Sequence, residues 1–412
     1  MAEIYRKANR VIVWLGERAD DSDQAVEEIR IAAGKQSTYF PTHGTLQRAI
    51  LALLRRPWFR RIWVLQEVAA ARYVRIMCGP MEIDGYAFCS GLEPLKHIYR
   101  ALPNLQNLIP SVIYLIKEAI FRPDCQTSSS GRVSLDICPL GELIDMFHTH
   151  EAKLRHDRVY ALLGMSSDNT TAAGLSPDYK VRWKQLFERL IKFLLCQQIF
   201  VGTQDDRETA VIKSKGCILG QVSVEEDTSS GDTRKLIVMS RDTPGFLEYK
   251  KEWTARWTLP TSAKSILHGD LVCLLQGAKN PTIIRIRNDH FAVIKIAVTP
   301  PEYARWLELV RTITIFPRDF LLIWNWEKCS GESQDRGEHE SLIKTNSRVL
   351  EHLKTSLLGK ATGLWNVALI LEDIENYKGA EERLREVIEC CERASARLAN
   401  KQSINPNRLP LD

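Results

Sequence analysis

Pro57-Trp58-Phe59-Arg60-Arg61-Ile62-Trp63-Val64-Leu65-Gln66-Glu67-Val68 is the most informative segment of this sequence. Proline suits the first turn of a helix, where its missing N–H costs no hydrogen bond. Behind it, Phe59, Ile62, Trp63 and Gln66 recur at steps of three and four residues, which predicts one helix with an inward-facing side. Glu67 follows Trp63 by four residues, so both project from the same side.

Two interpretations of Glu67 stay open. A carboxylate beside a buried indole has its pKa raised by desolvation, which is a property of functional acids. The alternative is a core helix whose single acid pairs with a neighbouring arginine. The residue types favour the core helix, and they do not exclude the functional acid.

Positive charge gathers around this stretch. Between residues 55 and 75 the chain has one acid and six arginines, namely Arg55, Arg56, Arg60, Arg61, Arg72 and Arg75. Such a field suits a pyrophosphate or another anion, with Arg60, Arg61 and Trp58 as candidate ligand-binding residues. The alternative is a solvated helix end with arginines stacked on Trp58 and Trp63.

The composition is that of a globular protein. The chain has 412 residues, and 56 basic against 51 acidic residues leave a net charge of only +5. This charge is too small to indicate a nucleic-acid partner. Ten cysteines without a C-x-x-C pair favour a reducing compartment. The apolar run from Leu105 to Phe121 is interrupted by a proline and by charges, so we expect a cytoplasmic protein without a membrane span.

Histidines and cysteines do not form a convincing metal site in this sequence. His148, His150, His156 and Cys138 lie close together in the chain, and the pattern favours ordinary polar surface over a zinc site. We expect ordinary polar surface there, and no metal.

The order of the predicted elements defines four regions. Residues 1–95 read as α/β, with a buried strand at 11–16, helices at 23–33, 45–54 and 57–68, and a strand at 73–79. Residues 96–200 are mostly helical, with helices at 140–147, 157–165 and 183–196. Residues 201–300 form a small β-rich module. Residues 301–412 are expected to be helical, with a hairpin at about 360–398 whose turn is Asn376-Tyr377-Lys378-Gly379.

Three blocks in order resemble the fungal heterokaryon incompatibility (HET) domain. They are Ile4-Tyr5-x-x-Ala8-x-x-Val11-Ile12-x-Trp14-Leu15-Gly16, then Arg56-Pro57-Trp58-Phe59-x-Arg61-x-Trp63-Val64-x-Gln66-Glu67-Val68, then Cys78-Gly79. The resemblance covers about ninety residues. Two pieces of the β-rich module, Gly269 to Cys273 and Pro281 to Arg285, resemble a module common in long HET proteins.

The HET domain is itself a distant relative of the TIR domain, a three-layer α/β fold. Enzymes of the TIR family cleave NAD with a glutamate four residues after a tryptophan, the spacing of Trp63 and Glu67. The analogy implies that Glu67 is the catalytic carboxylate, with Trp63 and Gln66 beside it, and that NAD is a substrate rather than a cofactor. The family's opening block has no counterpart here, so we expect an incomplete domain and impaired activity.

Two functions follow from the resemblance. The first is a fungal non-self recognition protein that triggers programmed cell death, through NAD cleavage and self-association of its HET domain. The second is a non-catalytic scaffold that binds protein partners through its C-terminal helices. Small residues Ala368 and Ala380, with bulky Leu384 and Val387, resemble one tetratricopeptide repeat. One such repeat is a weak signal, and an ordinary helical hairpin is the equal alternative.

Overall fold

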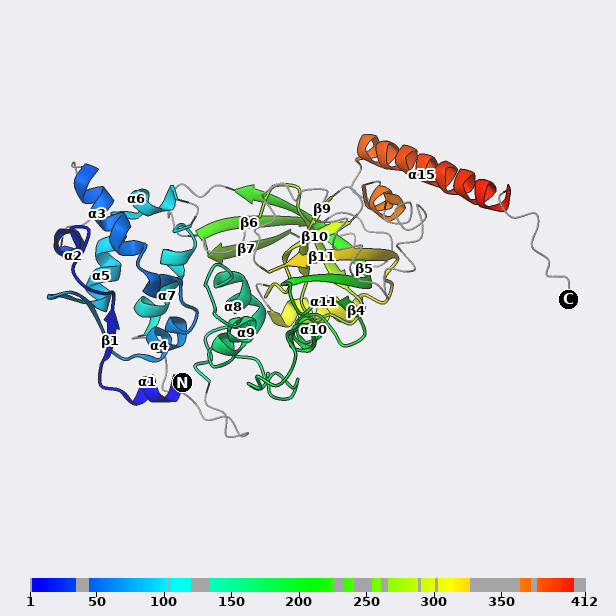
Figure 1. The fold of residues 1–412 in the computed structure, drawn as a ribbon. Coiled ribbons are helices and arrows are strands. Elements are labelled where there is room, and N and C mark those ends of the chain that lie inside the picture. Colours follow the sequence, from blue (N-terminus) through cyan, green and yellow to red (C-terminus); the bar gives the residue numbers. More distant parts are fainter. Residues whose placement is uncertain are drawn as a thin grey trace, which may run out of the picture. The chain divides into compact units, whose positions relative to one another are not determined.

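The chain divides into two compact units. A computed structural model describes residues 2–34, 44–102, 104–119, 134–225, 233–240, 254–260, 266–287, 290–300, 303–326, 364–371 and 376–403. The first unit is Met1–Arg182 with Leu259–Ala263, and the second is Trp183–Thr258 with Lys264–Asp412. Each unit has a β-sheet, and helices accompany both sheets (Figure 1). The predicted α/β class is confirmed, and the predicted loop at 34–44 lies largely outside the described residues.

The first unit is built on a three-stranded sheet. Its strand order is β1 (Val11–Trp14), β2 (Val74–Cys78) and β3 (Met81–Asp84), with β1 parallel to β2 and β3 antiparallel to β2. Val11 and Val13 are buried on one face, as are Val74 and Ile76. Helices α2 (Ser22–Gly34) and α5 (Gly85–Leu92) pack against each other, and α2 also contacts β3 while α5 contacts β2 and β3.

Further helices complete the first unit. They are α1 (Ala2–Lys7), α3 (Gly44–Leu54), α6 (Lys96–Arg100), α7 (Leu108–Ala119), α8 (Leu140–Met146) and α9 (Arg155–Leu163). Helix α4 (Val64–Ala70), which contains Gln66 and Glu67, contacts α1, α7 and α9 and so lies among the helices of this unit. The predicted helices at 23–33, 45–54 and 140–147 are confirmed within one or two residues.

The prediction of one continuous helix over 57–68 is wrong. Residues Pro57–Arg60 form a 3₁₀ turn, Arg61 is extended with φ −72° and ψ 128°, and α4 begins only at Val64. The reason is a distant backbone partner. The N–H of Ile62 donates to the carbonyl of Glu151 at 3.0 Å, and the N–H of Glu151 donates to the carbonyl of Arg60 at 2.6 Å. This strand-like pairing replaces the helical hydrogen bonds at the break.

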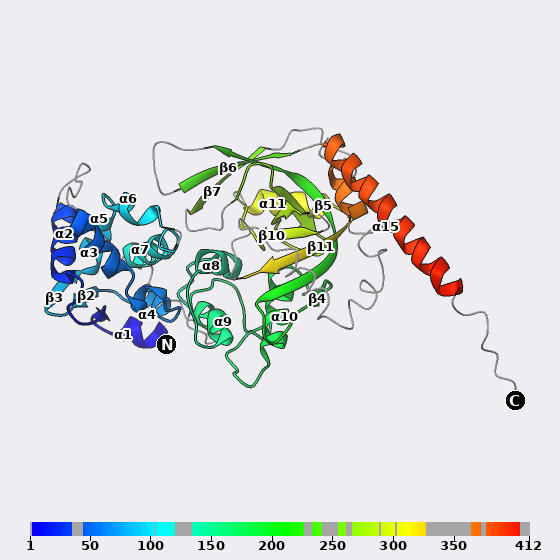
Figure 2. The ribbon, with the colours of Figure 1, turned by 45° about the horizontal axis from the view of Figure 1, so that its top comes forward.

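The second unit is a closed barrel. Its strands are β5 (Thr209–Glu225), β8 (Leu271–Leu275), β9 (Thr282–Ile286), β10 (Phe291–Lys295) and β11 (Arg318–Asn325). They pair in this order, and β11 then pairs back to β5. The long bent strand β5 in Figure 2 makes the closure possible, because its first half pairs with β11 and its second half with β8. Gly216 sits where the partner changes, and a Cβ there would meet Phe320 and the Leu274 carbonyl at 2.8 Å.

Shorter elements surround the barrel. Strand β4 (Phe200–Gly202) also pairs with β5, and β6 (Thr233–Ser240) with β7 (Thr254–Pro260) extends the sheet beyond it. Helix α11 (Tyr303–Thr312) precedes β11. Helix α10 (Trp183–Leu194) contributes Trp183 and Phe187 to an aromatic cluster with Trp324 and Trp326.

Strand β11 corrects the prediction that residues 301–412 are helical. Its buried residues include Phe320, Leu322 and Trp324, which alternate along the strand and face the interior. The barrel needs this strand to satisfy the backbone of β5, whose residues Thr209 to Gly216 pair with it one by one. The β-rich module therefore extends past Pro300 and Pro301.

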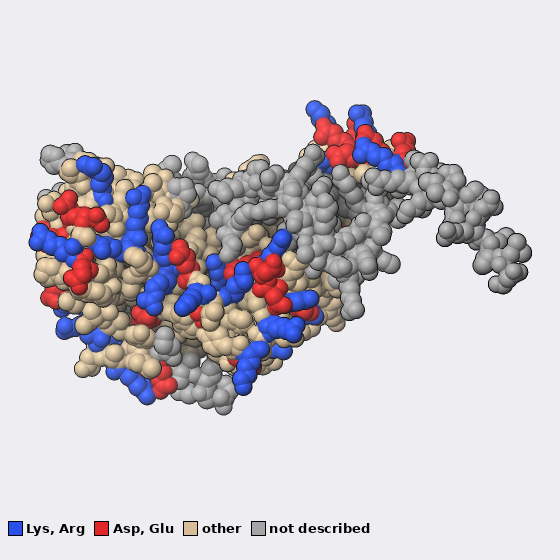
Figure 3. All heavy atoms as spheres, in the orientation of Figure 1, with Lys and Arg blue, Asp and Glu red and all other residues tan. Residues whose placement is uncertain are grey.

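Helices follow at the C-terminal end. A helix at residues 364–371 places Leu364 in a cluster with Cys390, Val387 and Cys391 of α15 (Tyr377–Ser403). The predicted turn at 376–379 is wrong, because the Asn376 side chain accepts from the N–H of Gly379 and α15 begins at Tyr377. Figure 3 shows charges of both signs on α15. Arg385 and Glu381 of this helix form an ion pair at 2.6 Å. Whether these helices form a tetratricopeptide-like repeat stays a prediction.

Candidate functional site

The candidate catalytic acid, Glu67, lies in the first turn of α4 and is half-buried. The Tyr5 hydroxyl on α1 donates a hydrogen bond to its carboxylate. Burial raises the pKa of Glu67, whereas the Arg61 charge and the Tyr5 hydrogen bond lower that pKa and only partly offset the burial. Burial, together with the nearby Glu67 charge, also raises the pKa of Tyr5, so the phenol stays protonated and remains a donor.

The two indoles occupy different settings. Trp63 is the residue before α4 and is half-buried. Trp58 is buried and packs edge-to-face on Phe59, with ring centroids 5.2 Å apart. Phe59 in turn stacks on Phe88 of α5. Trp58 therefore contributes to the core of this unit, which leaves Trp63 as the more accessible of the two rings.

Gln66 is directed away from Glu67, into the protein. Its Nε2 atom donates to the carbonyl of Ala161 at 2.7 Å and to that of Tyr160 at 3.4 Å, and the side chain is buried. Gly164 makes room for it, because a Cβ there would lie 2.9 Å from Nε2. These contacts tie α4 to α9.

The arginines between residues 55 and 75 contact different partners. Arg60 lies 3.6 Å from the carboxylate of Glu151, and Arg75 pairs with Glu82 at 2.9 Å. Arg56 donates to the carbonyl of Ala19 at 3.2 Å. Arg61 is exposed and close enough to Glu67 to affect its pKa. Of the predicted anion-binding residues, the structure brings Arg61 to the candidate acid.

Tyr5 is the site residue that sequence reasoning missed. Periodicity within a helix connects Trp63 to Glu67, but no spacing rule connects residues as distant as Tyr5 and Glu67. The only signal was the presence of Tyr5 in the first of the three family-like blocks. The packing of α1 on α4 brings the two side chains together.

Part of the chain matches a known protein family. Residues 1–67 match the model of the family Heterokaryon incompatibility protein (HET). The match supports a HET-type protein and contains both Tyr5 and Glu67; it ends before the third block, Cys78-Gly79. No curated protein and no solved structure gives a significant match to the chain.

The region after the HET match is joined by polar contacts among its own blocks. The Tyr179 hydroxyl donates to the carboxylate of Asp157 at 2.7 Å, and the Tyr160 hydroxyl donates to the carbonyl of Asp178 at 2.8 Å. His156 Nε2 lies 2.7 Å from the carbonyl of Val181. Helix α9 thus contacts both the 176–181 segment and Gln66.

The expectation of polar surface at His148 and His150 is wrong, because both are buried. Burial lowers the pKa of His150 to about 3. Across the described residues, no group of three or more His, Cys, Asp and Glu side chains is placed to hold a metal ion. Nor does any helix in the described part of the chain have the length and apolarity needed to cross a bilayer.

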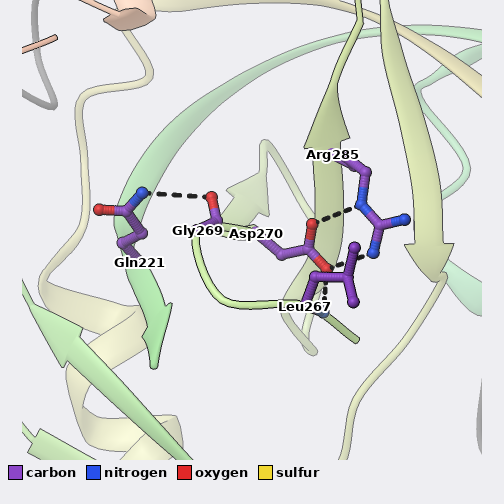
Figure 4. A network of polar contacts seen from close by, with 5 residues as sticks. All are labelled: Gln221, Leu267, Gly269, Asp270 and Arg285. Carbon is purple, nitrogen blue, oxygen red and sulfur yellow. Dashed lines mark hydrogen bonds and ion pairs between the residues drawn. The ribbon is translucent and has the colours of Figure 1, made fainter. Parts of the chain in front are cut away.

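A second polar cluster lies in the barrel (Figure 4). Asp270 and Arg285 form a two-pronged ion pair, with Nε–Oδ1 at 2.7 Å and Nη2–Oδ2 at 2.9 Å, and Asp270 also accepts from the N–H of Leu267. Gln221 donates to the neighbouring carbonyl of Gly269 at 3.2 Å. The ion pair joins the two pieces of sequence that resemble a module of long HET proteins, and its enclosure between strands gives it a structural role.

Proposed function

We propose that this chain is a fungal HET-type protein of non-self recognition that triggers programmed cell death by cleaving NAD in the cytoplasm. The observation that carries the proposal is the setting of Glu67. One carboxylate, within the HET-matched residues, is half-buried with a tyrosine donor and an arginine beside it. Desolvated acids with specific partners are enriched at functional sites. The spacing of Trp63 and Glu67 supports the same assignment by its analogy with TIR enzymes.

In the proposed reaction, the bond between nicotinamide and the ribose breaks, and nicotinamide leaves with the electron pair. The ionised Glu67 stabilises the positive charge that develops on the ribose. Water then adds to the ribose carbon and releases a proton, which gives ADP-ribose. Arg60 and Arg61 would bind the pyrophosphate, and Trp63 would stack on a ring of the substrate.

Tyr5 and Arg61 support this chemistry by favouring the charged form of Glu67. A protonated carboxyl has no charge with which to stabilise a cation. Because burial opposes ionisation, the hydrogen bond from Tyr5 and the charge of Arg61 keep more of the acid ionised near neutral pH. In this role Tyr5 is a positioning residue.

The test compares Glu67→Gln with the parent chain, purified and expressed in fungal cells. Glutamine keeps the shape and removes the charge. We expect NAD cleavage to fall by about 10²-fold or more, and cell death to fall with it. Glu27→Gln is the matched control, because Glu27 is an exposed acid of the same unit. Equal NAD loss in the parent and Glu67→Gln would overturn the catalytic proposal.

The runner-up function is a non-catalytic scaffold, and one observation favours it. Trp365 of the 364–371 helix and Tyr377 and Ile388 of α15 are exposed large apolar side chains. Such side chains are typical of surfaces that bind helices or peptides of other proteins. If this function holds, cell death persists in Glu67→Gln and is lost in Ile388→Lys. Glu392→Lys on the same helix is the control, and a death phenotype that follows Glu67 alone would exclude the scaffold.

A further inference from the structure

Strand β1 presents an unpaired edge in the first unit. Among the described strands, β2 pairs with one side of β1 and nothing pairs with the other. The N–H groups of Val11 and Leu15 donate to carbonyls at Tyr73 and Met77, toward β2. Since backbone groups alternate along a strand, the N–H and C=O groups of Ile12 and Trp14 point to the opposite edge.

The side chains of the same two residues are exposed. Ile12 is 59% exposed and Trp14 45%, and Tyr73, which precedes β2 on the same sheet face, is 67% exposed. Helices α2 and α5 pack on the opposite face, where Val11 and Val13 are buried. Strand β1 thus has both an unpaired backbone edge and an uncovered apolar face. A second β-strand with apolar side chains would pair with this edge and extend the apolar face.

Natural proteins protect strand edges with charges, prolines or bulges. Val11–Trp14 has none of these within its length, and its residue types are among the strongest strand formers. An unprotected edge of this kind is a site for strand addition.

We propose that β1 pairs antiparallel with β1 of a second copy of this chain, around a two-fold axis at Val13. The edge is self-complementary in this register. Ile12 lies opposite Trp14 of the second copy, and both members of each pair have their backbone groups directed at the partner. Two such pairs exchange four hydrogen bonds, and each also forms a β-branched–aromatic contact on the open face.

Charges at the ends of the strand favour the antiparallel direction. Arg10 precedes β1 and Glu17 follows it, and both are exposed. In the antiparallel pair, Arg10 lies near Glu17 of the second copy at each end. In a parallel pair, Arg10 would lie beside Arg10 of the second copy, which is unfavourable.

Sedimentation of the purified full chain over a range of concentrations tests the proposal. We expect a reversible dimer whose dissociation constant rises at least about tenfold in Trp14→Lys. Ile12→Pro removes only an outward N–H, so it should also block the dimer and leave the pairing with β2 intact. The matched control is Ile4→Lys, because Ile4 is an exposed apolar residue on α1. A monomeric parent chain, or a dimer unaffected by Trp14→Lys, would overturn the proposal.

Disulfide trapping then checks the register. A mixture of Ile12→Cys and Trp14→Cys chains places the two thiols on directly opposite residues, with Cα atoms about 5.5 Å apart, within disulfide range. Each variant alone places them diagonally, too far apart to bridge. A cross-link between the two tryptic peptides that contain residues 11–18, formed in the mixture only, supports the antiparallel pairing. A cross-link formed by Ile12→Cys alone would contradict it.

Discussion

The Tyr5 hydroxyl on α1 donates a hydrogen bond to the Glu67 carboxylate on α4, so helix α1 contributes to the ionisation of the candidate catalytic acid. This bond stabilises the charged form and lowers the pKa of Glu67, against the larger effect of burial. The proton affinity of Glu67 should therefore depend on a residue outside its own helix.

Tyr5→Phe should raise the pKa of Glu67 further, because it removes the hydrogen bond and keeps the ring. Carbon NMR of labelled glutamate side chains measures this titration directly and does not require activity. If the ionised acid is the active form, activity falls as the pH drops through this pKa, and Tyr5→Phe moves that fall to higher pH. Arg61→Gln should act in the same direction, whereas Arg55→Gln should not. A titration of Glu67 that is unchanged in Tyr5→Phe would contradict the assignment.

Replacement of Gln66 should cost stability. Gln66→Leu leaves the carbonyl of Ala161 buried without its donor, and this costs about 1–3 kcal/mol of unfolding free energy. Gln24→Ala on the exposed side of α2 should stay within about 0.5 kcal/mol. Urea denaturation measures both. An effect of Gln66→Leu on NAD cleavage without loss of stability would instead support the catalytic role predicted for Gln66.

Gly91 should not tolerate a methyl group. A Cβ at Gly91 of α5 would collide with the backbone carbonyl of Ile29 in α2, so the two helices would have to separate. Gly91→Ala should therefore destabilise the protein by about 1–3 kcal/mol or more, although alanine normally favours a helix. Gly34→Ala is the control, because the space around Gly34 is open and its effect should be within about 0.5 kcal/mol. Thermal unfolding measures the stability of both variants. Equal melting temperatures for Gly91→Ala and Gly34→Ala would contradict the prediction.

Local patterns predicted the elements whose partners are near in sequence. The strand at Val11, the helix after Ser22 and the strand at Val74 were predicted from periodicity and flanking turns. The expectation that the strand at Val11 is buried is wrong for one of its faces, because Ile12 and Trp14 are exposed. Local patterns gave wrong predictions where a segment distant in sequence determines the backbone conformation. Backbone hydrogen bonds with Glu151 interrupt the predicted helix at Arg61. Pairing with β5 makes residues 318–325 a strand.

In the candidate site, too, a relationship within one helix could be predicted, whereas contacts between helices could not. Glu67 could be predicted because it lies one helical turn from Trp63. Tyr5 could not be linked to it, since that contact depends on how α1 packs on α4. Periodicity could place Gln66 on an inward-facing side but could not identify its acceptors in α9.

His150 should make the protein sensitive to acid. Burial lowers the pKa of His150 to about 3 in the folded state, and the charges of His148 and Arg158 act in the same direction. The unfolded chain takes up that proton near pH 6.5. The unfolding free energy should therefore fall as the pH decreases from about 6.5, by up to about 1.4 kcal/mol per pH unit. His150→Leu should flatten this dependence, whereas His97→Gln, an exposed histidine, should not. Parallel stability curves for the parent and His150→Leu would contradict the prediction.

The ion pair of Asp270 and Arg285 should show strong coupling, because its side chains are only 2% and 12% exposed. Asp270→Ala leaves the guanidinium buried without its acid, which costs about 3–5 kcal/mol. Arg285→Met removes the opposite charge and leaves Asp270 unpaired. The double variant should be less destabilised than the sum of the two, because neither charge is then left alone. The exposed pair of Glu389 and Arg393 is the control, with a coupling of about 0–1 kcal/mol. Additive losses at Asp270 and Arg285 in chemical denaturation would show that the pair does not hold the barrel together.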